Sequence, residues 1–214
     1  MKRQRSFTIA PFADGPRSFK KPRQVRAASV SQVKRMIAAN TETKTFSYAS
    51  TPIAVGSTGT MQLLSAIPQG VSVIERVGQD IEVQRMIFRY SIELADAYNF
   101  LRFIIVRCKD SGTDILTNDE LVTFASTGYG YLGPVTYLNR DRFEVLHDSG
   151  TLPVHAGQPI RTGAVEINKK FKMTFNSSSI ATMKNAIRVY AWSESVIISH
   201  PVLTYTTQIQ FKDA

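Results

Sequence analysis

Apolar residues recur at every second position from about Thr41 to the C-terminal end, and this alternation constrains the possible fold more than any other feature. One segment keeps a single phase over eleven residues, with its apolar members at Val165, Ile167, Phe171, Met173 and Phe175. Successive side chains of a β-strand point to opposite faces, so a segment of this kind has one apolar and one polar face. The pattern predicts strands that each bury one face.

Several other segments carry strand patterns. Residues 81–94 alternate with one change of phase at Gln84–Arg85, which predicts a β-bulge. Residues 100–108 are almost continuously apolar, which predicts a strand covered on both faces. Further strands are predicted at residues 61–67, 142–147, 187–198 and 203–211, with Gly, Pro, Asn and Asp clusters between them. Only Thr117–Phe124 has the pattern of a short helix, capped by Thr117 or Asn118.

This arrangement of elements bounds the fold class. Seven or eight strands with turn signals and little helix predict an all-β protein, organised as a sandwich, jelly roll or barrel in residues 41–214. The single cysteine, Cys108, excludes an internal disulfide and is expected in the core. No apolar run is long enough to span a membrane, and the N-terminal region lacks the apolar stretch of a secretory signal. We expect no membrane insertion and a reducing compartment.

Positive charge is concentrated in the first 35 residues. They hold ten of the 26 Lys and Arg residues and one of the 17 acidic residues, which leaves 16 of each sign in the remainder. Residues 1–28, rich in basic residues, Phe and Pro, are predicted to form a disordered arm that binds single-stranded nucleic acid. A solvated tail that binds nothing is the alternative. The candidate nucleic-acid-binding residues are Lys2, Arg3, Arg5, Arg17, Lys20, Lys21, Arg23, Arg26, Lys34 and Arg35.

A short amphipathic helix is predicted at residues 29–40. Its apolar residues fall at helical spacing, Ser29 can cap its start, and Lys34 and Arg35 lie off the apolar stripe. A helix of this length is marginal in isolation, so we expect it to form against a neighbouring subunit or nucleic acid.

Residues with catalytic or metal-binding chemistry do not form a recognisable motif. The three histidines, His147, His155 and His200, have no metal-ligand spacing. His147–Asp148 is a pair that hydrolases use, but a strand-end His beside a turn Asp is the commoner explanation. We therefore expect no catalytic residues and no enzyme, although a site assembled from distant residues stays open as an alternative.

A set of short blocks follows a distinctive order and spacing along the chain. The blocks are Val33–Ile37, Glu42, Lys44, Phe46, Gly59–Thr60, Leu64–Ser65, Gln69–Gly70, Arg76, Gly78, Phe100–Ile104, Arg142–Asp148 and Asp213–Ala214. In this order they resemble the coat proteins of satellite tobacco necrosis virus and its relatives, and the capsid proteins of small circular single-stranded DNA viruses that share that coat fold. The similarity runs from about Val33 to Asp148 and includes the C terminus.

The resemblance implies a single eight-stranded jelly roll whose sixty copies close an icosahedral shell of the smallest (T=1) kind. The basic arms would then point inward onto a single-stranded genome. No cofactor is required, and the host receptor stays unknown.

The resemblance also implies structural calcium between subunits. The matching ligand positions here are Glu42, Asp213 and the loop Val77–Asp80, with Asp80 as its acidic residue. Carboxylate and main-chain oxygens from two chains suit calcium. The acidic residues that follow Gln-Gly in the satellite proteins are replaced by Val71–Ser72, so an ion bound there is expected to be absent.

Besides the enzyme with a site assembled from distant residues, three functions remain open at this point. A capsid protein that packages single-stranded DNA is favoured, and a satellite-type coat protein that packages single-stranded RNA is its closest alternative. The virion is the expected location, with assembly in the host nucleus for a DNA genome and in the cytoplasm otherwise. The third is a non-viral β-sandwich binding module with a nucleic-acid-binding tail, which would behave as a monomer or small oligomer.

Overall fold

The computed structural model describes Ser29, Ser31, Ile180 and residues 42–109, 115–136, 138–176, 182–196 and 199–214. The chain divides into two compact units, Met1–Asn40 and Thr41–Ala214, and the strands of the described residues all lie in the second. The predicted arm of residues 1–28 lies outside the described residues. So does the predicted helix of residues 29–40, apart from Ser29 and Ser31, whose hydroxyl oxygens lie 2.9 Å apart.

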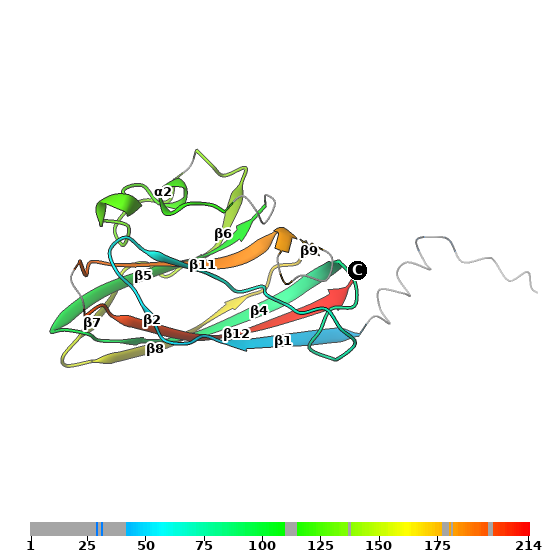
Figure 1. Ribbon diagram of the computed structural model, residues 1–214, viewed down its shortest axis with the longest axis horizontal. Coiled ribbons are helices and arrows are strands. Elements are labelled where there is room, and N and C mark those ends of the chain that lie inside the picture. Colours follow the sequence, from blue (N-terminus) through cyan, green and yellow to red (C-terminus); the bar gives the residue numbers. More distant parts are fainter. Residues whose placement is uncertain are drawn as a thin grey trace, which may run out of the picture. The chain divides into compact units, whose positions relative to one another are not determined.

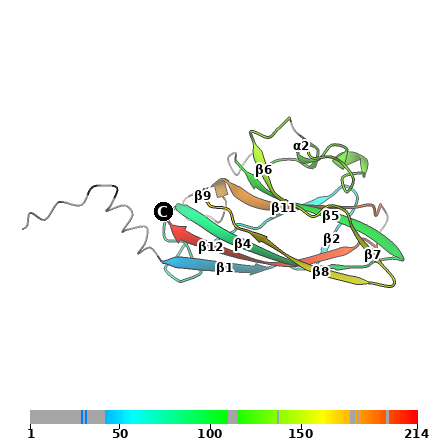
Figure 2. The same ribbon diagram turned by 180° about the vertical axis from the view of Figure 1, so that it is seen from behind.

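Two antiparallel sheets form a sandwich, as the alternation predicts, and Figures 1 and 2 show them as two layers. The first sheet has seven strands in the described residues: β1 (Thr43–Ala49), β12 (Val202–Asp213), β4 (Asp80–Glu93), β9 (Phe171–Phe175) and β10 (Thr182–Lys184), with β2 (Ile53–Ala54) beside β12 and β8 (Ile160–Ile167) beside β4. The second has five: β3 (Thr60–Leu63), β11 (Ala186–Ser193), β5 (Tyr98–Cys108) and β6 (Phe143–Asp148), with β7 (Leu152–His155) beside β5.

The connections follow the jelly-roll pattern. The chain starts in the seven-stranded sheet with β1, crosses to the other sheet at β3, returns at β4 and crosses again at β5. β6 and β7 then line one side of β5, and β8 and β9 line one side of β4. Finally β11 enters between β3 and β5, and β12 closes the first sheet between β1 and β4.

The described residues form twelve strands, so the predicted number of eight is wrong. The excess arises partly because one predicted strand is interrupted. Val165–Phe175, predicted as one strand, divides into β8 and β9, because Met86 pairs with Ile167 while Val83 pairs with Phe171. Two residues of β4 therefore face three on its partner, and the ladder breaks there. The short strands β2 and β10 are additions that the alternation does not reveal.

The predicted β-bulge is confirmed. Along the pairing of β4 with β12, Arg85 lies opposite Gln210, and Val83 lies opposite Phe211. Gln84 is thus the extra residue, and the bulge restores the apolar phase on the inner face of β4.

The main core lies between the sheets and contains the inward side chains of both, among them Phe88, Phe103 and Tyr205. A second core lies on the outer face of the five-stranded sheet, beneath residues 115–136, which we call the cover segment. Leu121 and Val122 of the cover segment pack there with Tyr190 and Trp192 of β11. The two cores explain the continuous burial of β11 and most of β5, and they confirm the predicted two-sided burial of residues 100–108. Cys108 is buried, as expected.

The predicted helix at residues 117–124 is present but shorter. α2 (Asn118–Leu121) begins with a capping box in which Thr117 and Glu120 bond each other's main chain. It ends because Val122 is extended and pairs with Val135, after which the chain forms the 3-10 helix η1 (Ala125–Thr127). Figure 1 shows α2 over the five-stranded sheet. No helix among the described residues is long and apolar enough to cross a membrane.

Trp192 joins the cover segment to the five-stranded sheet. It is fully buried, and a Cβ at Gly130 would lie 2.4 Å from its Cδ1 atom. Gly130 therefore lets the loop approach the indole closely, which gives the Gly128–Gly130 turn a packing role.

Candidate subunit-contact and nucleic-acid surfaces

The ten candidate nucleic-acid-binding residues, from Lys2 to Arg35, lie outside the described residues. The described body shows the complementary property, because many of its charged side chains pair with one another. The ion pairs are Lys44–Asp213, Arg85–Glu166, Arg102–Asp148, Arg107–Glu144, Arg142–Glu120, Lys169–Glu144 and Lys172–Asp80. A cation that already pairs with a carboxylate contributes little to phosphate binding. The excess positive charge of the sequence lies in the first 35 residues, since the remainder holds equal numbers of basic and acidic residues.

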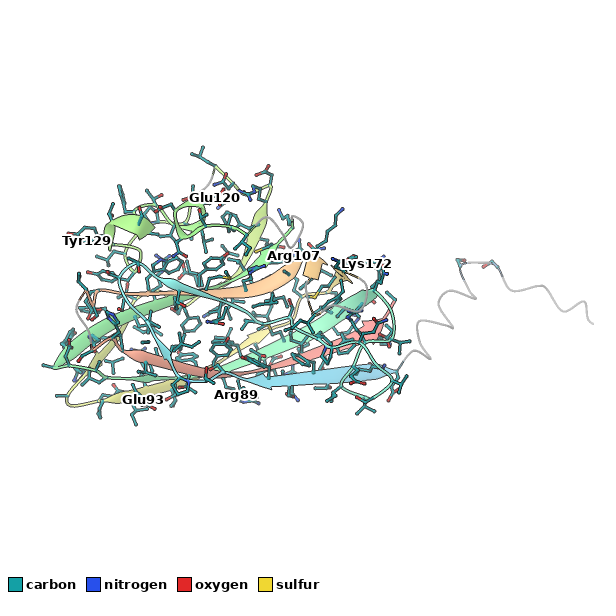
Figure 3. All side chains as sticks on the ribbon, in the orientation of Figure 1. Arg89, Glu93, Arg107, Glu120, Tyr129 and Lys172 are labelled. Atoms are coloured by element: carbon teal, nitrogen blue, oxygen red, sulfur yellow. The ribbon has the colours of Figure 1, made fainter. Side chains whose placement is uncertain are left out.

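A cavity of about 380 Å³ on the five-stranded sheet has a basic lining that includes Arg107, Lys109 and Arg140. Its cations are directed at protein atoms: Arg107 lies 2.7 Å from Glu144, and Lys109 donates to the Arg140 carbonyl at 2.7 Å. Figure 3 labels Arg107 on the five-stranded sheet. The cavity is therefore a weak candidate for nucleic-acid binding.

Three strand ends meet beside the C terminus, where β12 ends and β1 and β4 begin (Figure 1). Here the Lys44 ammonium lies 2.9 Å from the Glu75 carbonyl oxygen and 3.0 Å from Asp213 Oδ2. Asp213 Oδ1 accepts the Val77 amide N–H at 3.0 Å. We call Lys44, Glu75, Val77, Asp80 and Asp213 the C-terminal junction.

The predicted calcium ligands gather at this junction. Asp80 begins β4 next to the end of β12, and its carbonyl accepts the Ala214 N–H at 3.2 Å. Glu42 is exposed and directly precedes β1. Within one chain the C-terminal end thus lies beside Asp80, whereas the ligand set was predicted between subunits.

Two of these carboxylates, those of Asp213 and Asp80, are already occupied by cations and donors of the chain. Asp213 holds Lys44, and Asp80 holds Lys172 at 2.9 Å and the Thr174 hydroxyl at 2.8 Å. Within one chain these residues do not fit an open calcium site, and the described residues contain no group of three or more metal-binding side chains. Calcium shared between two subunits stays a prediction.

A tightly bonded loop, residues 69–78, leads from β3 toward β4, and we call it the braced loop. The Gly70 N–H donates to the Arg76 carbonyl at 2.9 Å, and the Arg76 N–H donates to the Pro68 carbonyl at 3.0 Å. Arg76 is fully buried, donates to the Ile67 and Gly78 carbonyls, and lies 4.2 Å from the centroid of the Phe175 ring. Burial lowers the pKa of this guanidinium, and Asp213 partly offsets the effect. Arg76 anchors the loop through its two hydrogen bonds and its contact with the Phe175 ring.

The outer side of the braced loop is apolar. Val71 is 95% exposed, Val77 55%, and Val73 and Ile74 also lie in solvent. Four aliphatic side chains on a loop held by internal hydrogen bonds form a surface suited to protein contact. Sequence analysis missed this surface, although the run of aliphatic residues between Gly70 and Gly78 was its available signal.

Other exposed apolar side chains lie at the cover segment and at the far end of the sandwich. Phe124, Tyr129 and Leu132 are exposed on the cover segment, and Figure 3 shows Tyr129 on the side away from the main core. Tyr98 and Ile160, the first residues of β5 and β8, are also exposed. Figure 1 shows both strands reaching the end of the sandwich opposite the C terminus. Apolar surface at several separate places suits a chain that contacts more than one neighbour.

The His147–Asp148 pair is part of the structural framework. Arg102 donates through Nε to Asp148 Oδ1 at 2.9 Å and through Nη2 to Oδ2 at 2.5 Å. Burial alone would raise the pKa of the Asp148 carboxyl, but the hydrogen bonds from Arg102 and Gly150 lower it. Burial lowers the pKa of His147, and Asp148 partly offsets this. Because Arg102 holds both oxygens, Asp148 is not placed to orient His147 for catalysis.

The other two histidines occupy separate contacts. His155 stacks on Tyr98 with ring centroids 5.9 Å apart, and His200 Nδ1 lies 3.1 Å from Ser195 Oγ. Among the described residues, the histidines therefore share no common site.

Comparison with protein families matches residues 17–214 to the family described as satellite tobacco necrosis virus coat protein. The match covers the whole sandwich and seven of the ten basic arm residues, from Arg17 to Arg35. No curated protein matches the chain. A similar solved structure is a chain of the T13 IBDV viral particle, with 7% sequence identity over 82% of this chain and 39% of that chain; its TM-score of 0.16 carries no argument.

Proposed function

Because the chain belongs to the satellite tobacco necrosis virus coat protein family, we propose that it self-assembles into a small icosahedral shell and packages a single-stranded genome through its basic arm. Membership of a coat protein family supports a structural role in the virion rather than an enzymatic one. The observation that carries the proposal is the family match across residues 17–214, which includes both arm and sandwich. It favours a capsid protein over a non-viral binding module.

Self-assembly is supported by the exposed apolar surfaces. The braced loop presents four aliphatic side chains, and Arg76 holds that loop to the body. A preorganised apolar surface loses little conformational freedom when it meets a partner, which favours association. We propose that copies of this chain meet through it and that sixty of them close the shell.

Genome packaging is supported by the separation of charge between arm and body. Sixty arms with a net charge of +9 would bring about 540 positive charges into the shell, which neutralises roughly half the phosphates of a genome of about 1,000 nucleotides. Binding of this type is indifferent to base sequence and weakens steeply as salt concentration rises.

Two resemblances bear on the type of genome, and they point to different types. The sequence blocks favour single-stranded DNA, with assembly in the host nucleus. The family match, which names a satellite virus coat protein, favours the alternative of single-stranded RNA with assembly in the cytoplasm. The arm does not discriminate, because it reads phosphates and base stacking rather than the 2′-hydroxyl.

Negative-stain electron microscopy of the purified full-length chain tests the proposal, together with its ratio of nucleic-acid to protein absorbance. We expect uniform shells rich in nucleic acid, and DNase or RNase treatment of the extracted nucleic acid identifies its type. Deletion of residues 1–35 should abolish nucleic-acid binding at moderate salt. Tight, salt-resistant binding by the truncated chain would contradict the role of the arm.

A second variant tests the contact surface. Replacing Val71 and Val73 by Ser removes exposed apolar area, and we expect assembly to weaken while the thermal unfolding of the subunit stays unchanged. The matched control is Val196→Ser, which removes an exposed valine on a different loop. Shells that form equally well with the two loop substitutions would contradict this contact.

A further inference from the structure

We propose that the Lys44 ammonium is the structural cation of the C-terminal junction and takes the place that calcium would hold beside Asp213. The resemblance to the coat protein family implies calcium at the matching positions. It concerns stability of the subunit itself and does not depend on assembly.

Lys44 lies in an unusual place for a lysine. It belongs to β1, pairs with Phe211 of β12, and is only 7% exposed. Phe46, two residues along the same strand, is also buried, so Lys44 points into the sandwich. A buried ammonium is costly unless oxygen atoms surround it. Its position therefore requires dedicated partners.

Its partners are oxygens from two separate segments. The Glu75 carbonyl oxygen of the braced loop lies 2.9 Å from Nζ, and the Asp213 Oδ2 atom at the end of β12 lies 3.0 Å from it. One carboxylate and one main-chain carbonyl are ligands of the type that calcium takes. The separations are those of charge-assisted hydrogen bonds, which are longer than the roughly 2.3–2.6 Å of calcium–oxygen contacts.

The remaining oxygen of Asp213 is also engaged. Oδ1 accepts the Val77 N–H at 3.0 Å, so one carboxylate connects the ammonium of β1 with the main chain of the braced loop. The Ala214 N–H donates to the Asp80 carbonyl at 3.2 Å and fixes the end of β12 beside β4. Asp213 is held in the orientation that Lys44 needs.

The charge balance also favours an ammonium. Glu75 turns its carboxylate to the Ser72 N–H at 3.0 Å and offers only its carbonyl to Lys44. The second predicted acidic ligand, Asp80, holds Lys172 at 2.9 Å. One carboxylate therefore faces Lys44 and balances a single positive charge, whereas a divalent ion beside Asp213 would be repelled by the ammonium.

Thermal unfolding of the full-length wild-type chain gives the first test. The measurement uses excess EDTA in one sample and excess calcium chloride in the other, at a salt concentration that keeps the chain dispersed. We expect the same Tm in both. A Tm that falls in EDTA and rises with calcium would overturn the proposal.

Substitution of the lysine gives the second test. Lys44→Met keeps the length of the side chain but removes its charge, and we expect Tm to fall by roughly 5 °C or more because Asp213 loses its cation. The matched control is Lys170→Met, which removes the same charge from an exposed site and should leave Tm unchanged. Equal Tm values for the two variants would overturn the proposal.

A third variant tests whether Lys44 occupies the place of an ion. Lys44→Ser removes the ammonium and opens space beside Asp213 and the Glu75 carbonyl. We expect calcium chloride to raise the Tm of this variant while leaving that of the wild type unchanged. If calcium chloride leaves the Tm of Lys44→Ser unchanged, the proposal that Lys44 takes the place of a calcium ion is contradicted. Because each readout is unfolding of the dispersed chain, failure to form shells would leave these results intact.

Discussion

The two sheets of the sandwich differ in what covers their outer faces. The seven-stranded sheet exposes an outer face of mostly polar residues, and β12 alternates buried and more accessible positions along its length. In the five-stranded sheet, β11 is buried at all eight positions, because the main core lies on one side and the cover segment on the other. Figure 3 shows Arg89 and Glu93 on the open face and Glu120 and Tyr129 above the covered one.

This difference determines where stability should reside. On the open sheet, an outward side chain contacts solvent and a few neighbours, so its loss costs little. On the covered sheet, both faces belong to packed cores, so the loss of a large side chain leaves a cavity whichever face that side chain points to. The covered sheet is also the place where polar groups need partners, since water does not reach them.

The largest expected effect is at Trp192, which lies between the covered sheet and the cover segment. Trp192→Ala should destabilise the chain by about 3–5 kcal/mol, because it leaves a cavity where Gly59 and Gly130 approach the indole. The indole N–H makes no hydrogen bond in the part of the chain that the structure describes, so the loss is one of packing. Urea unfolding measures it.

The control for Trp192 lies on the open sheet. Thr206→Ala changes an exposed side chain of β12, and we expect a change within about 0.5 kcal/mol. Trp192→Phe keeps part of the volume and should cost less than Trp192→Ala. If Trp192→Ala and Thr206→Ala unfolded at the same urea concentration, the cover segment would not be a packed core.

A smaller effect separates a covered ion pair from an open one. Arg102 and Asp148 have side-chain exposures of 9% and 31%, whereas Arg85 and Glu166 have 38% and 46%. Arg102→Met leaves Asp148 without its cation and the Gly133 carbonyl without a donor, so it should cost about 2–4 kcal/mol. Arg85→Met should cost about 1 kcal/mol or less. Similar unfolding free energies for the two variants would remove the distinction between the sheets.

The sequence predicted the open sheet better than the covered one. One-sided alternation identified most of β4 and β12, and the phase change at Gln84 located the bulge, because register and burial are coupled along a half-buried strand. The near-continuous apolar run of residues 100–108 predicted a second covering layer without identifying it. The cover segment itself contributes scattered apolar residues, such as Leu116 and Val135, whose inward direction depends on loop geometry rather than period.

The candidate surfaces show the same division. The role of Asp80 and Asp213 as calcium ligands between subunits stays a prediction. Their lysine partners were not predicted, because ion pairing depends on rotamers and register. Likewise, the alternation of Val71 and Val73 resembles a buried strand in sequence. Their exposure follows from the bonds that Arg76 and Glu75 make inside the loop, which no local pattern reveals. The basic arm was predicted from composition and stays a prediction.

The smallest expected effect is the dependence of stability on pH through Asp148 of the covered sheet. Its hydrogen bonds with Arg102 and Gly150 lower its pKa in the folded chain below the unfolded value of about 3.9. The stabilisation is therefore complete above that pH and is lost as pH falls through the folded pKa. We expect a loss of about 1 kcal/mol or less at acid pH, and Asp148→Asn should remove this part of the pH dependence.

Two other titratable groups must be separated from this effect. His147 has a lowered pKa, so its protonation favours the unfolded chain as pH falls below about 6.5, a higher range than that of Asp148. His147→Gln removes that contribution and leaves the acid limb to Asp148. On the open sheet, hydrogen bonds from Asn168 and Arg85 lower the pKa of Glu166, but solvent screens this carboxylate. Glu166→Gln should thus leave the pH profile of urea unfolding unchanged, and a change as large as that of Asp148→Asn would show that burial does not distinguish the two carboxylates.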